Sequence, residues 1–289
     1  MRALSYARLL RAHQWSKNLF VLAGLVFASA WHDPALTVAA LIAAAAFCLA
    51  SSAVYAFNDC RDAAFDRDHP GKRDRPVASG ALAPGEAYAF SGALAAAALA
   101  LAAAAGAGVL ACIAAYFSLN FAYSLALRRV PLLDVLSIAA GFLLRLLAGT
   151  AAIGITPSGW LLLCGLLLAV FFGFAKRRAE LAQLAAAATR HRAVLAGYSA
   201  RFLDAALLAS AAGLLGAYSL YAVAGDSATP HGTLRLAWTL PWVILGLSRY
   251  LVVVYRHGGG GDPAAELLRD PVLELSALGW GAAVAWTAL

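Results

Sequence analysis

Long apolar runs separated by short charged segments dominate this chain. Runs long enough to cross a membrane lie at residues 17–31, 35–57, 87–105, 107–127, 132–153, 158–175, 204–224, 236–256 and 272–288. The first run is the shortest of the nine. Because a helix satisfies its own backbone hydrogen bonds in hydrocarbon, the pattern predicts an all-α integral membrane protein with about nine transmembrane helices.

Composition excludes a water-soluble protein. Of the 289 residues, 63% are hydrophobic and 13% are charged, and the mean hydropathy is +0.76. Nothing resembles a soluble domain or a long linker, so we expect one polytopic membrane domain over residues 1–289. The net charge of +7 is spread over several short loops. It therefore favours membrane lipids and phosphate substrates as partners, and no nucleic acid.

The basic residues predict the orientation of the chain. Nineteen of the 22 Lys and Arg residues fall in alternate loops, beginning with the amino-terminal segment. The positive-inside rule then places the amino terminus and the loop after residue 57 in the cytoplasm, and the carboxyl terminus outside. The first apolar run leads into Trp31-His32-Asp33-Pro34 rather than a cleavage site, so we expect it to be retained.

Residues 58–76 carry five carboxylates and five cationic side chains in this otherwise apolar chain. Asp59, Asp62 and Asp66 stand at i, i+3 and i+7, within an arc of roughly 60° on a helix. Hard oxygen ligands of this kind suit magnesium, which also retains room for phosphate oxygens. Three cations follow closely, so the segment indicates a magnesium-bridged diphosphate, bound in addition by Lys72, Arg73 and Arg75. A solvated loop between two membrane helices is the alternative.

A second charged segment, Lys176 to Leu181, follows an apolar run. Lys176 and Glu180 are spaced i, i+4, so a simple intrahelical ion pair is one interpretation and a contact to substrate is another. Arg177 is similarly either a substrate contact or a flanking cation that anchors the topology or contacts lipid headgroups. The two interpretations stay open for both residues.

Arg145 interrupts a membrane helix, where a charge requires a partner or a polar cavity. A structural ion pair and a contact to a substrate phosphate fit it equally well. Asp134 lies about three helical turns earlier, so we expect each of the two residues to find partners elsewhere or to snorkel toward the membrane surface.

The motif Asn58-Asp59-x-x-Asp62-x-x-x-Asp66, followed by Lys72-x-x-Arg75-Pro76, resembles the first aspartate-rich motif of the UbiA superfamily of intramembrane prenyltransferases. Further local patterns resemble the decaprenyl-phosphate phosphoribosyltransferase branch of that superfamily. They are Gln14-Trp15-Ser16-Lys17-Asn18, Tyr123-Ser124 with Asp134-Val135, Gly141-Phe142 with Arg145, Lys176 to Leu181, and Glu266 to Asp270. Ordinary prenyltransferases of the superfamily carry a second aspartate-rich motif where this chain has Lys176 to Glu180.

The resemblance implies a UbiA-like helical bundle with a cytoplasm-facing polar cavity in a bacterial plasma membrane. It implies transfer of a 5-phosphoribosyl group from 5-phosphoribosyl 1-diphosphate to a polyprenyl phosphate, with release of diphosphate. Lys17 and Arg145 are candidates to hold the lipid phosphate, and Glu180 to contact ribose or a second magnesium. The remaining candidates for substrate contact are Asn18, Asn58, Tyr123, Lys176 and Arg177.

Three other functions stay open. A prenyltransferase would move a prenyl group from its diphosphate to an aromatic or quinone precursor, a lipid transporter would line a passage with its charges, and a membrane scaffold would need no catalytic residue. Most acidic residues gather on one predicted face of the membrane, which disfavours the transporter. The sequence leaves both a monomer and a homo-oligomer open.

Overall fold

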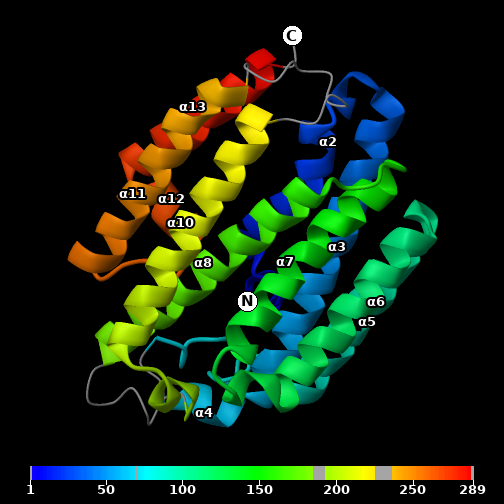
Figure 1. The fold of residues 1–289 in the computed structure, drawn as a ribbon. Coiled ribbons are helices and arrows are strands. Elements are labelled where there is room, and N and C mark those ends of the chain that lie inside the picture. Colours follow the sequence, from blue (N-terminus) through cyan, green and yellow to red (C-terminus); the bar gives the residue numbers. More distant parts are fainter. Residues whose placement is uncertain (1, 69–70, 185–192, 225–235, 288–289) are drawn as a thin grey trace. The chain divides into compact units, whose positions relative to one another are not determined.

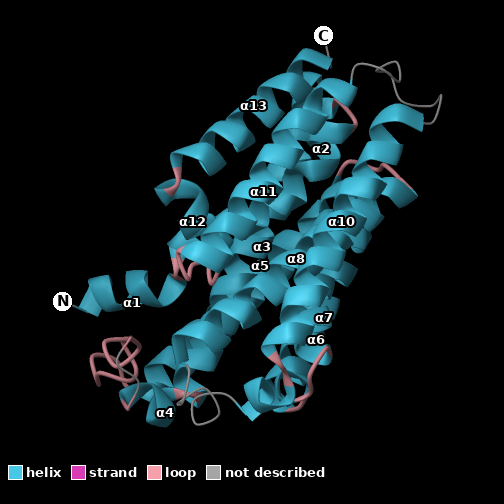
Figure 2. Ribbon diagram, turned by 60° about the vertical axis from the view of Figure 1, so that its left-hand side comes forward, coloured by secondary structure: helices cyan, strands magenta, loops and turns pink. Residues whose placement is uncertain are grey.

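The computed structural model describes residues 2–68, 71–184, 193–224 and 236–287, and these residues form helices and loops without a strand (Figure 2). The helices in chain order are α1 (Arg2–Leu10), η1 (Ala12–Leu22), α2 (Ala23–Phe27), η2 (Ala30–His32), α3 (Pro34–Arg61), α4 (Ala63–Arg67), α5 (Pro84–Ala105), α6 (Ala107–Leu125), η3 (Leu127–Arg129), α7 (Leu133–Ala152), α8 (Gly159–Leu184), η5 (Ala193–Gly197), α10 (Ala200–Ala224), η6 (Leu236–Thr239), α11 (Leu240–Arg256), α12 (Pro263–Arg269) and α13 (Pro271–Thr287). The predicted all-α fold is confirmed.

The chain divides into two compact units. Unit 1 comprises Met1–Ser124 and Leu144–Pro157, and unit 2 comprises Leu125–Leu143 and Ser158–Leu289. Helix α7 contributes its first half to unit 2 and its second half to unit 1. The single membrane domain expected over residues 1–289 stays a prediction.

Seven helices among the described residues are long and apolar enough to cross a membrane, so the chain is a multi-pass membrane protein. They are Pro34–Arg61, Pro84–Ala105, Ala107–Leu125, Leu133–Ala152, Gly159–Ala182, Ala200–Val223 and Leu236–Arg256. The described residues do not confirm the predicted count of nine. The last predicted span is α13, whose 17 residues measure about 26 Å.

The first predicted span, residues 17–31, folds as parts of η1, the short helix α2 and η2. Side chains of η1 bond to α3, where Trp15 Nε1 donates to Ser52 across 3.0 Å and Asn18 Nδ2 donates to Ser51 across 3.2 Å. The backbone also meets α7 closely, since a Cβ on Gly149 would collide with the carbonyl group of Val21. These contacts hold the segment in a shape that its hydropathy did not reveal.

Three helices begin with the same Asp-Pro signal. Proline lacks the N–H that would be unpaired at the first helical position, and the preceding aspartate caps the next N–H groups. Asp33 accepts from the N–H of Ala35 at 2.8 Å to start α3, and Asp262 accepts from Ala264 at 3.2 Å to start α12. Asp270 starts α13 in the same way.

In unit 1, helices α3 and α5 lie side by side, and alanines dominate the core that they share with α6 and the second half of α7 (Figure 1). Small side chains let helix backbones approach closely, which supplies packing where lipid offers no hydrophobic drive. Phe47 and Tyr116 are the aromatic members of this core, with their ring centroids 5.4 Å apart.

In unit 2, helix α8 packs along α10 and helix α11 packs along α13 (Figure 1). The core is richer in aromatic residues than that of unit 1, and Phe171, Phe174 and Tyr250 are buried in it. A Cβ on Gly173 would lie 2.6 Å from a methyl group of Val135, so glycine permits the start of α7 to pack against α8.

Candidate functional site

The loop after α4 is anchored by apolar side chains. Val77 and Leu82 are buried with Leu9 of α1 and with Ala56 and Cys60 of α3. The loop backbone closes on itself through bonds from Ser79 N–H to the carbonyl group of Arg75 and from Leu82 N–H to that of Pro76. This anchoring fixes the position of Arg75, which precedes the buried segment.

Arg75 joins two of the predicted metal ligands. Its Nη1 donates to Oδ2 of Asp66 across 2.6 Å and to Oδ1 of Asp59 across 3.2 Å. Both carboxylates are nearly inaccessible, since the side chain of Asp59 is 2% exposed and that of Asp66 is 5% exposed. The Arg75 side chain is 27% exposed. Two buried acidic groups thus converge on one positively charged nitrogen.

A second arginine completes the cluster. Arg11 Nη2 bonds to the same Oδ1 of Asp59, and its guanidinium lies over the ring of Tyr55, 5.2 Å from the centroid. Burial lowers the pKa of Arg11, and the carboxylate of Asp59 opposes that shift. We name Arg11, Asp59, Asp66 and Arg75 the four-charge cluster.

The donor chemistry of this cluster fits a divalent cation. Among the described residues, no three acidic, histidine or cysteine side chains gather closely enough to hold a metal ion. Asp59 and Asp66 nevertheless present hard oxygens to one shared positive charge, and magnesium is commonly bound by one or two carboxylates together with water and substrate phosphates. The helix breaks at Asp62, the residue between α3 and α4. The metal-ligand role of Asp62 stays a prediction.

The other predicted residues of unit 1 lie around this segment and on η1 and α6. Lys72 is half-buried and Arg73 is exposed in the loop before Arg75. Lys17 is half-buried on η1 and bonds to Gln14, and Tyr123 is half-buried near the end of α6. Their contacts to substrate stay predictions.

Arg145 is buried in unit 1 beside Asn18, another predicted residue. Its Nε donates to Oδ1 of Asn18 across 2.8 Å, and its Nη2 donates to the hydroxyl group of Tyr116 across 3.3 Å. The guanidinium also lies over the rings of Phe47 and Tyr116, at 5.4 and 4.8 Å. These polar and aromatic partners explain how the membrane helix α7 accommodates a charge.

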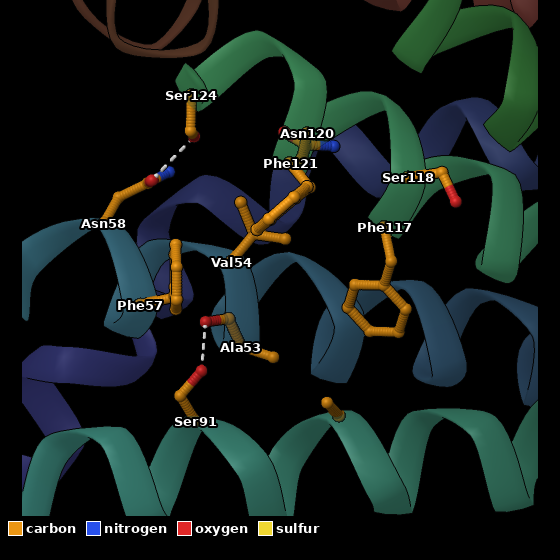
Figure 3. A pocket seen from close by; sticks show the side chains of 11 residues that line it. Ala53, Val54, Phe57, Asn58, Ser91, Phe117, Ser118, Asn120, Phe121 and Ser124 are labelled. Atoms are coloured by element: carbon orange, nitrogen blue, oxygen red, sulfur yellow. Dashed lines mark hydrogen bonds between the residues drawn. The ribbon is translucent and has the colours of Figure 1, made fainter. Parts of the chain in front are cut away.

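An apolar pocket of about 410 Å³ lies between α3, α5 and α6 in unit 1 (Figure 3). Val54 and Phe57 line it from α3, and Phe117 and Phe121 from α6. The Ser124 hydroxyl group donates a hydrogen bond to Asn58 Oδ1 across 2.9 Å, and the two side chains lie at one end of the pocket (Figure 3). Asn58, at this end of the pocket, directly precedes Asp59 of the four-charge cluster in the sequence.

Unit 2 holds a buried ion pair built on Arg177. Its Nε lies 2.5 Å from Oδ2 of Asp134, both side chains are 0% exposed, and its Nη1 bonds to Glu180. The Tyr198 hydroxyl group donates to Asp134 across 2.6 Å and accepts from the N–H of Leu132 across 2.6 Å. Burial raises the pKa of Tyr198, and its hydrogen bond to Asp134 adds to that shift.

This arrangement bears on the interpretations left open for the second charged segment. Glu180 is paired with Arg177, three residues earlier, and Lys176 is half-buried on the same helix. Arg177 is enclosed by protein, unlike a side chain that anchors in lipid headgroups. Asp134 and Arg145 find separate partners, as expected from their spacing.

Residues 18–262 match the UbiA prenyltransferase family. The chain belongs to this family. It is therefore a membrane transferase, and the resemblance to the UbiA superfamily is confirmed.

Two named relatives and a solved structure resemble this UbiA chain along nearly its whole length. The decaprenyl-phosphate phosphoribosyltransferase of Corynebacterium glutamicum is 33% identical over 281 residues, covering 94% of this chain and 82% of the relative. The enzyme of the same name from Mycolicibacterium smegmatis is 33% identical over 280 residues, covering 93% and 88%. The structure of a UbiA homologue from Archaeoglobus fulgidus, bound to GPP and Mg²⁺, shares the fold with a TM-score of 0.74 and 20% identity, covering 97% of this chain and 99% of that one.

Sequence reasoning on this UbiA chain missed Arg11 and Tyr198 as members of its charged clusters. Arg11 lies 48 residues before Asp59, and Tyr198 lies 64 residues after Asp134. No local spacing pattern predicts a contact between residues so far apart in the sequence. The only signal was that a buried carboxylate requires a cationic or hydrogen-bonding partner.

Proposed function

We propose that this protein transfers a 5-phosphoribosyl group from 5-phosphoribosyl 1-diphosphate to a polyprenyl phosphate and releases diphosphate, with magnesium as cofactor. The observation that carries the proposal is the identity of 33% with decaprenyl-phosphate phosphoribosyltransferases over more than nine tenths of the chain. Lys176 to Glu180, in place of a second aspartate-rich motif, supports the same donor.

The four-charge cluster supports a site for the leaving diphosphate. Magnesium bound there would supply positive charge to the diphosphate as it leaves. Asp59 and Asp66 supply buried oxygen ligands, and the partly exposed Arg75 supplies N–H donors for phosphate oxygens. We include Asp62, Lys72 and Arg73 in this site as further ligands and contacts.

The chemical step needs few other groups. An oxygen of the lipid phosphate forms a bond to the anomeric carbon, while the bond from that carbon to diphosphate breaks. The lipid phosphate is anionic near neutral pH, so no strong general base is required. Catalysis then rests on positioning and on charge stabilisation of an oxocarbenium-like transition state.

The acceptor lipid needs a phosphate contact and a place for its tail. We assign Lys17 and Arg145, with Asn18, to the phosphate, and Tyr123 to a neighbouring substrate contact. The apolar pocket between α3, α5 and α6 suits part of a polyprenyl chain, because three membrane-spanning helices form its walls and Asn58 lies at its polar end. Glu180 remains a candidate for contacting the ribose or a second magnesium, and Lys176 a candidate for contacting substrate.

Transfer of a prenyl group from a prenyl diphosphate is the second candidate function. The solved UbiA homologue bound to GPP and Mg²⁺ favours it, because that protein has the same fold. The two functions differ in the donor, which makes them separable in one assay.

The test is transfer of radiolabel from ribose-labelled 5-phosphoribosyl 1-diphosphate into an organic-extractable polyprenyl phosphate, by purified protein with and without magnesium. We expect label in the lipid with wild type and magnesium, and none with Asp59→Ala. Absence of label with a folded wild-type protein and several lipid lengths would overturn the proposal. Label transfer from a prenyl diphosphate would then support the second candidate.

We place the protein in a bacterial plasma membrane with its amino terminus and active site toward the cytoplasm. The clustering of Lys and Arg in alternate loops supports this orientation. The named relatives come from bacteria, which supports the assignment to a bacterial plasma membrane.

A further inference from the structure

In the four-charge cluster, Arg11 and Arg75 already pair with the carboxylate oxygens that a divalent metal would need. We propose that Arg11 and Arg75 are displaceable counter-ions, which hold Asp59 and Asp66 until a divalent cation takes their place and which then bind the diphosphate. The inference rests on the proposed function, and it assigns Arg11 a positioning and diphosphate-binding role.

Arg11 is built into the cluster rather than resting on its surface. It has left-handed backbone angles, φ 50° and ψ 48°, at the junction between α1 and η1. Such a conformation is unfavourable for a residue with a side chain and persists where surrounding contacts enforce it. Here the ring of Tyr55 and the carboxylate of Asp59 hold the guanidinium.

The charges of the cluster balance. Two carboxylates face two guanidiniums, so the buried group is neutral as it stands. Adding a dication would leave an excess of two positive charges in a poorly solvated place, at a large electrostatic cost. The cost falls when the guanidiniums turn away to a new anionic partner. Diphosphate, with several negative oxygens, is such a partner.

Metal and diphosphate should therefore bind cooperatively. In the absence of diphosphate, a metal ion must displace both arginines without compensation. In the absence of metal, the arginines are occupied by the carboxylates and hold diphosphate poorly. Each ligand then raises the affinity for the other by the same factor.

The first experiment measures binding of Mn²⁺ alone to purified protein by electron paramagnetic resonance of the free ion. Arg11→Gln removes one competing cation, so we expect it to bind Mn²⁺ about fivefold more tightly than wild type. Arg11→Lys keeps the cation and should bind as wild type does. Arg8→Gln is the matched control, because Arg8 is an exposed cation on the same segment.

The second experiment measures retention of labelled diphosphate by the same proteins in EDTA and in Mn²⁺. Wild type should retain diphosphate only with Mn²⁺, and Arg11→Gln should retain less with Mn²⁺ than Arg8→Gln does. Arg75→Gln offers a second variant and should likewise bind Mn²⁺ alone more tightly than wild type.

Two results would overturn the inference. One is unchanged or weaker binding of Mn²⁺ alone by both Arg11→Gln and Arg75→Gln, and the other is full retention of diphosphate by wild type in EDTA. Neither experiment contains the ribosyl donor or the lipid. Failure of displacement is therefore distinguishable from failure of the phosphoribosyl transfer assay.

Discussion

Arg145 donates a hydrogen bond from Nε to Oδ1 of Asn18 across 2.8 Å, joining residues that lie 127 positions apart in the chain. Both side chains are buried in unit 1, at 5% and 2% exposure. The bond therefore links η1 to α7 and gives a membrane-buried cation a fixed acceptor. It makes the amino-terminal segment part of the folded core of unit 1.

Replacement of Asn18 by alanine should destabilise the protein by about 1–3 kcal/mol, because the buried guanidinium loses an acceptor. Unfolding in detergent micelles measures the change. Asn120→Ala is a suitable control, since the Asn120 amide bonds only to a carbonyl group one turn earlier among its described hydrogen bonds. Equal destabilisation by the two variants would contradict the prediction.

Arg177→Met should destabilise the protein by about 3–5 kcal/mol, because it leaves the carboxylate of Asp134 buried without its cation. Adding Asp134→Leu should restore much of the loss, since the pair is then replaced by apolar groups. Denaturant unfolding and yield from the membrane both report the effect.

The neighbouring Arg178 gives the matched control. It pairs with Asp204 at 2.7 Å, with both side chains partly exposed, so Arg178→Met should cost under about 1 kcal/mol. If Arg177→Met were stable and instead lost affinity for the ribosyl donor, Arg177 would be a substrate contact rather than a structural residue.

Filling the apolar pocket tests the proposed site for the lipid tail. Ala95 lines the pocket, so Ala95→Trp should raise the KM for polyprenyl phosphate about tenfold, a loss of about 1.4 kcal/mol, with little change in the KM for the ribosyl donor. Ala97→Trp on the exposed face of the same helix is the control. Similar KM values for the two variants would remove the pocket from the lipid site.

Asp270 predicts a dependence of stability on pH. A hydrogen bond from Arg249 lowers the pKa of Asp270, and its carboxylate also caps α13. A lowered pKa in the folded state stabilises the protein above the ordinary pKa of about 3.9, and this contribution is lost as pH falls through the folded value.

Asp270→Asn should therefore unfold more readily than wild type at pH 7, and the difference should shrink toward pH 3. Unfolding of both proteins across that range provides the measurement. Arg249→Gln should reduce the pH dependence, because the largest cause of the shift is removed. A difference that is constant with pH would contradict the assignment.

Local pattern was sufficient for much of this fold. Apolar runs of spanning length predicted the seven membrane-spanning helices of the described residues, and in the structure the Asp-Pro pairs at residues 33, 262 and 270 stand at three helix starts. Both are short-range signals, because helix formation and capping depend on residues a few positions apart. Hydropathy did not predict the division of residues 17–31 into η1, α2 and η2, where side-chain bonds join η1 to α3.

The class of protein, the family motif and the candidate residues Asp59, Asp62, Asp66 and Arg75 could all be predicted from the amino-acid order. The pairing of the charges could not, because it depends on how the helices pack. Arg11 joined Asp59, and Arg177 joined Asp134, while Asp62 became the residue at which the helix breaks. A buried charge must be neutralised by whichever partner the packing brings within a few ångströms, at any separation along the chain.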